Sequence, residues 1–255
     1  MVASHHSRIT APAFGYILTM TISKFLPALI WLMRVKFALI RAWSGAISPM
    51  GRWNSRNSRD LFRYLLLKQT GCCWVDADLI CLRPPEFQHD EMVFGYQSRK
   101  DYPQAINGAV LKLPREHPVL ADLIRHARGV VDVDERWGAI GPRLITAKFN
   151  EAGLSEFASA IADYYPVPPA DFWKLILPEG RESVEEAVRE SKLLHLWHKR
   201  FEMAGYNKEL APPRDSYLHQ AFERVGGLDG FTGIYDSDEL RVQLGRSLPS
   251  ASHQR

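Results

Sequence analysis

Acidic residues are missing from the beginning of this chain of 255 residues. Residues 1–59 contain no Asp or Glu, whereas they contain eight basic side chains: Arg8, Lys24, Arg34, Lys36, Arg41, Arg52, Arg56 and Arg59. Because the formal net charge of the whole chain is only +3, residues 60–255 are acidic overall. An acidic main part argues against nucleic acid as a partner, and the many apolar residues between 14 and 43 argue against a basic nucleic-acid arm.

Long uninterrupted apolar runs are also missing. Lys24 and Pro27 interrupt the apolar stretch Phe14–Met33, whereas a membrane-spanning helix needs about 18 or more apolar residues with few charges. A compact signal peptide with a small-residue cleavage site is not recognisable either. Residues 1–57 therefore form an atypical basic, apolar segment. A weak anchor with peripheral membrane association, a buried helix and a misread gene start all stay open for it.

Cysteine is scarce, with three residues, Cys72, Cys73 and Cys81. Three clustered cysteines without CxxC or Cys/His spacing exclude a disulfide framework and a structural zinc site. We expect them to be small buried residues of a strand, and we expect the protein to be cytoplasmic.

The segment after Asn57 alternates helical and strand patterns. Four helices are predicted from their end signals. One begins at a Ser58 cap and ends at Gly71, one extends from Pro118 to Gly129, and one extends from Pro142 to Gly153. A short fourth helix begins at Ser183, which has capping-box spacing. Apolar runs at residues 72–82 and 192–197 predict strands buried on both faces. The pattern predicts an α/β fold with a mostly parallel sheet flanked by helices. We expect one domain over residues 58–240 and a disordered tail over residues 241–255.

Two carboxylates interrupt the most apolar predicted strand. Asp76 and Asp78 are two positions apart, so an extended backbone directs both to the same side. Two like charges there are costly unless a cation lies between them, and Mg²⁺ or Mn²⁺ favours carboxylate and phosphate oxygens. The spacing predicts a metal–diphosphate site. A turn at Asp78, with Asp76 bonded to backbone amides, is the alternative.

The surrounding residues make this pattern more specific. Asp60 and Arg63 lie one turn apart on the predicted helix and share a face. The stretch from Ser58 to Pro84 resembles the signature of the DXD-containing sugar-transferase family, which includes capsular-polysaccharide and α-1,4-glycosyltransferases, the yeast initiating mannosyltransferase and the clostridial glucosylating toxins. The matching residues are Ser58, Arg59, Asp60, Leu61, Phe62, Arg63, Tyr64, Gly71, Trp74, Asp76, Asp78, Leu82 and Pro84.

The resemblance continues more weakly downstream. It includes Ile106-Asn107-Gly108-Ala109-Val110, His117-Pro118, Arg136-Trp137-Gly138, Gly141-Pro142 with Thr146, and His195-Leu196-Trp197. It therefore covers Ser58 to Trp197. Cys72 stands where the family has a second glycine. Residues 1–57 show no counterpart of the family's first strand and nucleotide-binding loop.

The resemblance implies a GT-A-like fold, a nucleotide-sugar donor, a Mn²⁺ or Mg²⁺ cofactor and sugar transfer with retention to a saccharide or glycolipid acceptor. It places the metal and diphosphate at Asp76, Asp78 and His195, with Trp197 as a further diphosphate contact. It places the transferred sugar at Asp60, Arg63 and Asn107. The sequence assigns no nucleophile or catalytic base.

Two other functions remain open at this stage. One is a truncated or degenerate transferase without activity. The other is a phosphatase of the haloacid dehalogenase type, in which an apolar strand also ends in DxD and the first Asp is the nucleophile; the resemblance to that class covers the local strand only.

Overall fold

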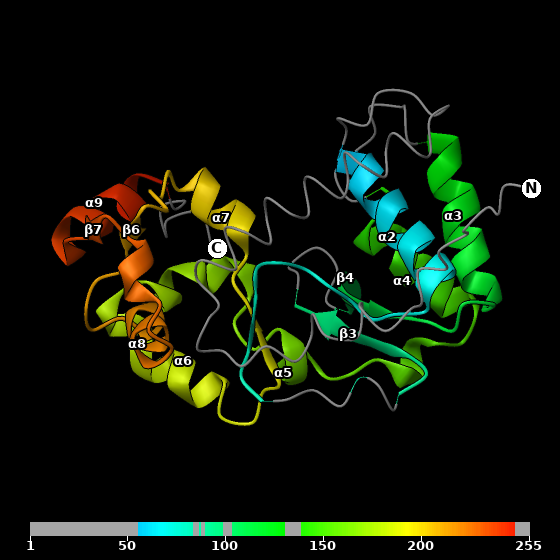
Figure 1. Cartoon of the computed structure of the whole chain (residues 1–255), viewed down its shortest axis with the longest axis horizontal. Helices are drawn as coiled ribbons and strands as arrows, with labels where there is room; N and C mark the ends of the chain where they lie inside the picture. Colours follow the sequence, from blue (N-terminus) through cyan, green and yellow to red (C-terminus); the bar gives the residue numbers. More distant parts are fainter. Residues whose placement is uncertain (1–55, 84–86, 88–89, 99–103, 131–138, 248–255) are drawn as a thin grey trace, which may run out of the picture.

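The computed structural model describes residues 56–83, 87, 90–98, 104–130 and 139–247. The predictions made for residues 1–55, 84–86, 131–138 and 248–255 lie outside this part. The described chain is a mixed α/β structure with small sheets. In Figure 1, helices α2, α3 and α4 lie at one end and α6, α8 and α9 at the other, with β3 and β4 between them.

Helix α2 (Arg56–Thr70) is the first described element and carries the predicted Asp60 and Arg63. It ends where predicted, at Gly71, whose φ of +68° suits glycine and whose N–H bonds the Leu67 carbonyl at 2.8 Å. Its start precedes Ser58, so Ser58 is not the cap. The helix is held by its apolar face, on which Leu61, Tyr64 and Leu67 are fully buried.

The larger sheet has the order β1 (Trp74–Val75), β4 (Ala105–Lys112), β3 (Val93–Gln97), and both pairings are antiparallel. Two predicted helices, α3 (Pro118–Val130) and α4 (Pro142–Glu151), share with α2 and this sheet one apolar core. Both helices begin at a proline, as expected from its fixed φ and missing N–H.

The smaller sheet pairs β2 (Leu79–Cys81) with β5 (Leu193–His195), again antiparallel. In the described chain the only parallel pair of strands is β6 (Leu210–Ala211) with β7 (Gly233–Ile234). The mostly parallel sheet that the sequence predicts is therefore not shown. The β3–β4 connection is too short for a crossover helix and allows only antiparallel pairing.

The strand predicted over residues 72–82 is two strands. The chain leaves the larger sheet after Val75, turns at Ala77-Asp78 and enters the smaller sheet at Leu79. A local apolar run does not reveal this change of partner. The cysteines are also less buried than expected, because Cys72 is exposed and Cys73 and Cys81 are half-buried.

Residues 155–247 form mainly short elements, and most of those after Val167 pack around a second apolar core. These are α5 (Ile161–Tyr164), α6 (Arg181–Ala187), α7 (His198–Met203), α8 (Tyr217–Arg224), α9 (Ser237–Ser247) and the 3₁₀ turns Ser155–Phe157, Pro169–Leu175, Pro178–Gly180 and Leu228–Gly230. Helix α6 starts at Arg181, ahead of the predicted Ser183. The predicted disordered tail is corrected for residues 241–247, which belong to α9, because Leu244 is buried in this core.

A third, smaller core connects the two sheets. It contains Ala109 and Val110 of β4, Leu193 of β5, and Tyr164 and Tyr165. No helix in the described residues is long and apolar enough to cross a membrane.

Candidate metal and diphosphate site

The two carboxylates lie where the chain crosses from one sheet to the other. The Asp76 N–H bonds the Ala109 carbonyl of β4 at 2.7 Å, and the Asp78 carbonyl accepts the Leu196 N–H, just after β5, at 2.8 Å. Each backbone is thus held by a different sheet. Asp78 lies in a turn, as its second residue and not at its start.

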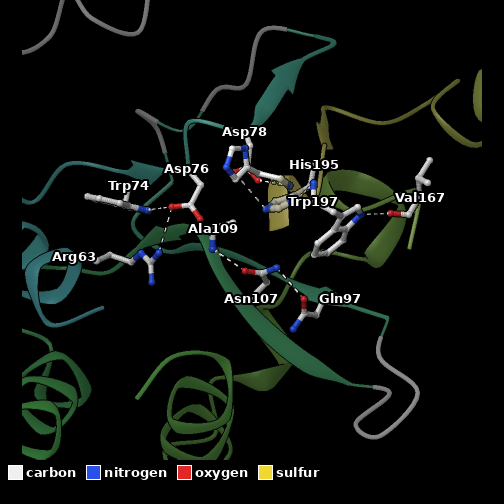
Figure 2. A network of polar contacts seen from close by, with 11 residues as sticks. Arg63, Trp74, Asp76, Asp78, Gln97, Asn107, Ala109, Val167, His195 and Trp197 are labelled. Carbon is white, nitrogen blue, oxygen red and sulfur yellow. Dashed lines mark hydrogen bonds and ion pairs between the residues drawn. The ribbon is translucent and has the colours of Figure 1, made fainter. Parts of the chain in front are cut away.

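Asp76 is held by side chains of the N-terminal half (Figure 2). Its Oδ1 accepts a hydrogen bond from Trp74 Nε1 at 2.7 Å and lies 3.2 Å from Arg63 Nη2. The Arg63 guanidinium also lies over the Trp74 ring, 5.1 Å from its centroid, which is within cation–π range. Asp76 is therefore held by a cation and an indole.

Arg63 is 7% exposed and also forms an ion pair with Asp60 one turn earlier. Burial opposes its charge, but Asp76 and Asp60 outweigh burial and raise the pKa of Arg63 above its usual value. For Asp60, burial is the larger effect and raises the pKa of the carboxyl, although the nearby charge of Arg63 lowers it. Asp60 and Arg63 share a face of α2, as predicted, and Arg63 on that face contacts Asp76 directly.

Two glycines leave room for this pair. A Cβ at Gly108 of β4 would lie 2.9 Å from Arg63 Nη1, and a Cβ at Gly141 would lie 3.0 Å from Asp60 Oδ2. Both contacts are tighter than ordinary van der Waals contact, so a larger residue at Gly108 would displace the end of the Arg63 side chain and one at Gly141 would press on the Asp60 carboxylate.

Asp78 is held mainly by backbone from the C-terminal half. Its Oδ2 accepts the His198 N–H at 3.0 Å, and its Oδ1 lies 3.7 Å from His195 Nε2. His195 is the last residue of β5 and is 7% exposed. One ligand atom each from Asp76, Asp78 and His195 lies within 4.8 Å of the other two. The structure thus brings together the three residues predicted for the metal and diphosphate.

Trp197 lies beside this group but its indole has another partner. The ring packs on His195 with a centroid distance of 4.2 Å, and Nε1 donates to the Val167 carbonyl at 2.7 Å. Its backbone N–H donates to His195 Nδ1 at 2.9 Å. In this structure Trp197 therefore orients His195, and its indole N–H is not available to a diphosphate.

Asn107 is engaged by neighbours on its own sheet. Its Oδ1 accepts the Ala109 N–H at 2.8 Å, and its Nδ2 donates to Gln97 Oε1 at 2.9 Å. The structure places it with Gln97 (Figure 2), and within the described residues its side chain makes no hydrogen bond to Asp60 or Arg63.

Sequence reasoning missed two residues of this region. Gln97 is 3% exposed and its Nε2 has no hydrogen-bond partner in the described structure. Tyr165 packs near both His195 and Trp197, and burial raises the pKa of its hydroxyl well above the usual value. Neither residue stands at a recognisable spacing, because each reaches the site through tertiary packing.

The arrangement can bind a hard cation. Two carboxylates converge beside a buried imidazole, and carboxylate oxygens are typical ligands of Mg²⁺ and Mn²⁺. The identity of the cation is not shown. Comparisons of the whole chain with protein-family models, with curated proteins and with solved structures find no match.

Proposed function

We propose that this protein is a metal-dependent glycosyltransferase that moves a sugar from a nucleotide-sugar donor to a saccharide or glycolipid acceptor, with retention. The observation that supports it best is the convergence of Asp76, Asp78 and His195 within 4.8 Å. The DxD motif and the final His-x-Trp are about 120 positions apart, and the sugar-transferase resemblance would place both at one diphosphate. A GT-A-like arrangement of the sheet is part of this proposal.

The donor set suits Mn²⁺ or Mg²⁺. Asp76 and Asp78 are partly exposed, with 26% and 19% of their side chains accessible, so both can share an ion with a ligand. When bound, such an ion stabilises the charge that develops on a departing diphosphate. The carboxylates hold the ion, and Arg63 and Trp74 hold Asp76 in one orientation toward it.

Arg63 acts here mainly through Asp76. Its two terminal nitrogens already contact carboxylates, whereas its buried Nε has no hydrogen-bond partner among the residues that the structure describes. We assign Asp60, Arg63 and Asn107 to the sugar side of the site, on the resemblance. The acceptor is assigned only by class.

The proposal is tested by Mn²⁺-dependent hydrolysis and transfer with UDP-, GDP- and ADP-sugars, comparing the wild type with Asp78→Asn. We expect the variant to lose at least 100-fold in kcat, in line with about 3 kcal/mol for an electrostatic stabiliser of the leaving group. Asp229→Asn, at an exposed turn residue, is the matched control and keeps full activity. Retention is read from the anomeric configuration of the product.

Full activity in Asp78→Asn would contradict the metal role. Mn²⁺ binding without turnover of any donor would favour the degenerate transferase. Trapping of beryllium fluoride on Asp76 would favour the phosphatase.

A further inference from the structure

One hydrogen bond assigns the tautomer of His195. The Trp197 N–H donates to His195 Nδ1 at 2.9 Å. A ring nitrogen that accepts a hydrogen bond carries no proton, and a neutral imidazole has one N–H. The geometry therefore assigns the N–H of the neutral ring to Nε2, the nitrogen that faces Asp78.

The turn that makes this bond is itself held in place (Figure 2). Trp197 has φ 55° and ψ 49°, and it is the only non-glycine residue with positive φ in the described part of the chain. Such a conformation is unfavourable for a bulky residue and persists only when its surroundings enforce it. Here the indole is anchored on the Val167 carbonyl and the next N–H, from His198, is anchored on Asp78 Oδ2.

A metal ligand needs a free lone pair, so a ligating His195 Nε2 would have to lose its proton. With Nδ1 also serving as an acceptor, the ring would then be an imidazolate unless the Trp197 N–H bond broke. The usual outer partner of a ligating histidine is an acceptor for the other ring N–H, whereas here the other ring nitrogen meets a donor. The hydrogen bond at Nδ1 of His195 therefore runs in the opposite direction from the one that supports a metal-ligating histidine.

We propose that His195 is not a metal ligand but a hydrogen-bond donor, whose Nε2–H binds an oxygen of the donor's diphosphate beside a cation held by Asp76 and Asp78. The inference rests on the proposed function. It also accounts for the separation of 3.7 Å between Nε2 and Asp78 Oδ1, which exceeds a hydrogen bond and leaves the Nε2–H for a ligand oxygen.

Two substitutions separate the ring nitrogens. His195→Asn places an amide oxygen near the position of Nδ1, so it can keep the Trp197 N–H bond while it removes the Nε2–H. His195→Gln reaches farther and can return an N–H near the position of Nε2. His219→Asn is the control, because His219 is also buried and bonds a backbone group, the Pro212 carbonyl, through Nδ1.

Binding of Mn²⁺ alone is measured by electron paramagnetic resonance, and binding of UDP, GDP and ADP with Mg²⁺ by calorimetry. We expect Mn²⁺ affinity to change by less than about twofold in all three variants. For the nucleotide that binds tightest, we expect about a 10- to 100-fold weaker Kd in His195→Asn, the range for a hydrogen bond to a charged group. His195→Gln should recover most of that loss, and His219→Asn should match the wild type.

A long-range ¹H–¹⁵N correlation spectrum of the wild type tests the tautomer without any variant. We expect Nε2 of His195 to be protonated and Nδ1 unprotonated, both before and after addition of Mg²⁺. Transfer of the proton to Nδ1 on adding Mg²⁺, or loss of Mn²⁺ binding in His195→Asn with the fold intact, would overturn the inference. Failure of the proposed function looks different, because then the wild type itself binds neither Mn²⁺ nor any of the nucleotides.

Discussion

Asp76 and Asp78 are two positions apart, yet different halves of the molecule hold them. Asp76 is bound by side chains, the Arg63 guanidinium and the Trp74 indole, which come from nearby in the sequence. Asp78 is bound by backbone, through the Leu196 and His198 N–H groups from far along the chain. The comparison teaches that a short motif need not be one structural unit. One carboxylate belongs to an ion-pair network and the other to a turn.

The largest effect should follow from removing the cation. Arg63→Met leaves Asp60 and Asp76 without their shared partner, so we expect the free energy of unfolding to fall by about 3–5 kcal/mol, as for other broken buried pairs. Urea denaturation measures this. Arg83→Met is the control, since Arg83 pairs with Glu190 at the surface and should leave the unfolding midpoint unchanged. Equal losses in both variants would show that the ion pairs of Arg63 with Asp60 and Asp76 stabilise the fold no more than a surface ion pair does.

The two Asp→Asn variants test the comparison directly. Without metal, we expect Asp76→Asn to lose about 1.5–3 kcal/mol of stability, because it weakens hydrogen bonds to a charged group. We expect Asp78→Asn to lose less than about 1 kcal/mol, because an amide oxygen can still accept the His198 N–H. Denaturation in the presence of a chelator measures both. The reverse order would break the distinction between a side-chain-held and a backbone-held carboxylate.

The two indoles offer a matched pair. Trp74→Phe removes an indole N–H bond to the Asp76 carboxylate, at about 1.5–3 kcal/mol, and Trp197→Phe removes one to the Val167 carbonyl, at about 1 kcal/mol. Only Trp74→Phe should also weaken Mn²⁺ binding, by a few-fold, because only that indole orients a ligand carboxylate. Equal Mn²⁺ affinities in the two variants would contradict this role of Trp74.

The smallest effect is expected from charges on α7. The Lys199 ammonium, followed by His198, lowers the pKa of Glu202 to about 2. A lowered pKa stabilises the folded protein above the ordinary value of 4.5, and this contribution is lost as the pH falls toward about 2. Because 41% of the Glu202 side chain is exposed, solvent screens the effect. We expect the Tm of Glu202→Gln to differ from wild type by about 1 °C or less at neutral pH, with the difference vanishing in acid and in high salt.

The sequence predicted well those features that local pattern determines. The helix at Pro118 and the helix at Pro142 follow from proline at the first helical position and an apolar face, and Gly71 ends α2 where its positive φ is needed. The meeting of Asp76, Asp78 and His195 was expected from the resemblance, and the geometry agrees.

The direction of strand pairing was not predictable in the same way. The run from Cys72 to Leu82 reads as one buried strand, because period and hydrophobicity do not reveal that β1 pairs with β4 and β2 with β5. The hydrogen-bond partner of the Trp197 indole was not predictable for a related reason. Its partner, Val167, is 30 positions away and contributes only a backbone carbonyl, which every residue has. The positions of Gln97 and Tyr165 beside the site likewise depend on tertiary packing and could not be predicted from the sequence.

The hydrogen bond from His198 to Asp78 spans 120 positions, whereas the one from Arg63 to Asp76 spans 13. At a synthesis rate of about 5–20 residues per second, Asp78 leaves the ribosome about 6–24 seconds before His198. During this time Asp76 can already have its arginine and tryptophan, while Asp78 still lacks its backbone donors. A nascent chain thus carries a half-built candidate cation site for seconds, and only the arrival of Leu196 and His198 completes it.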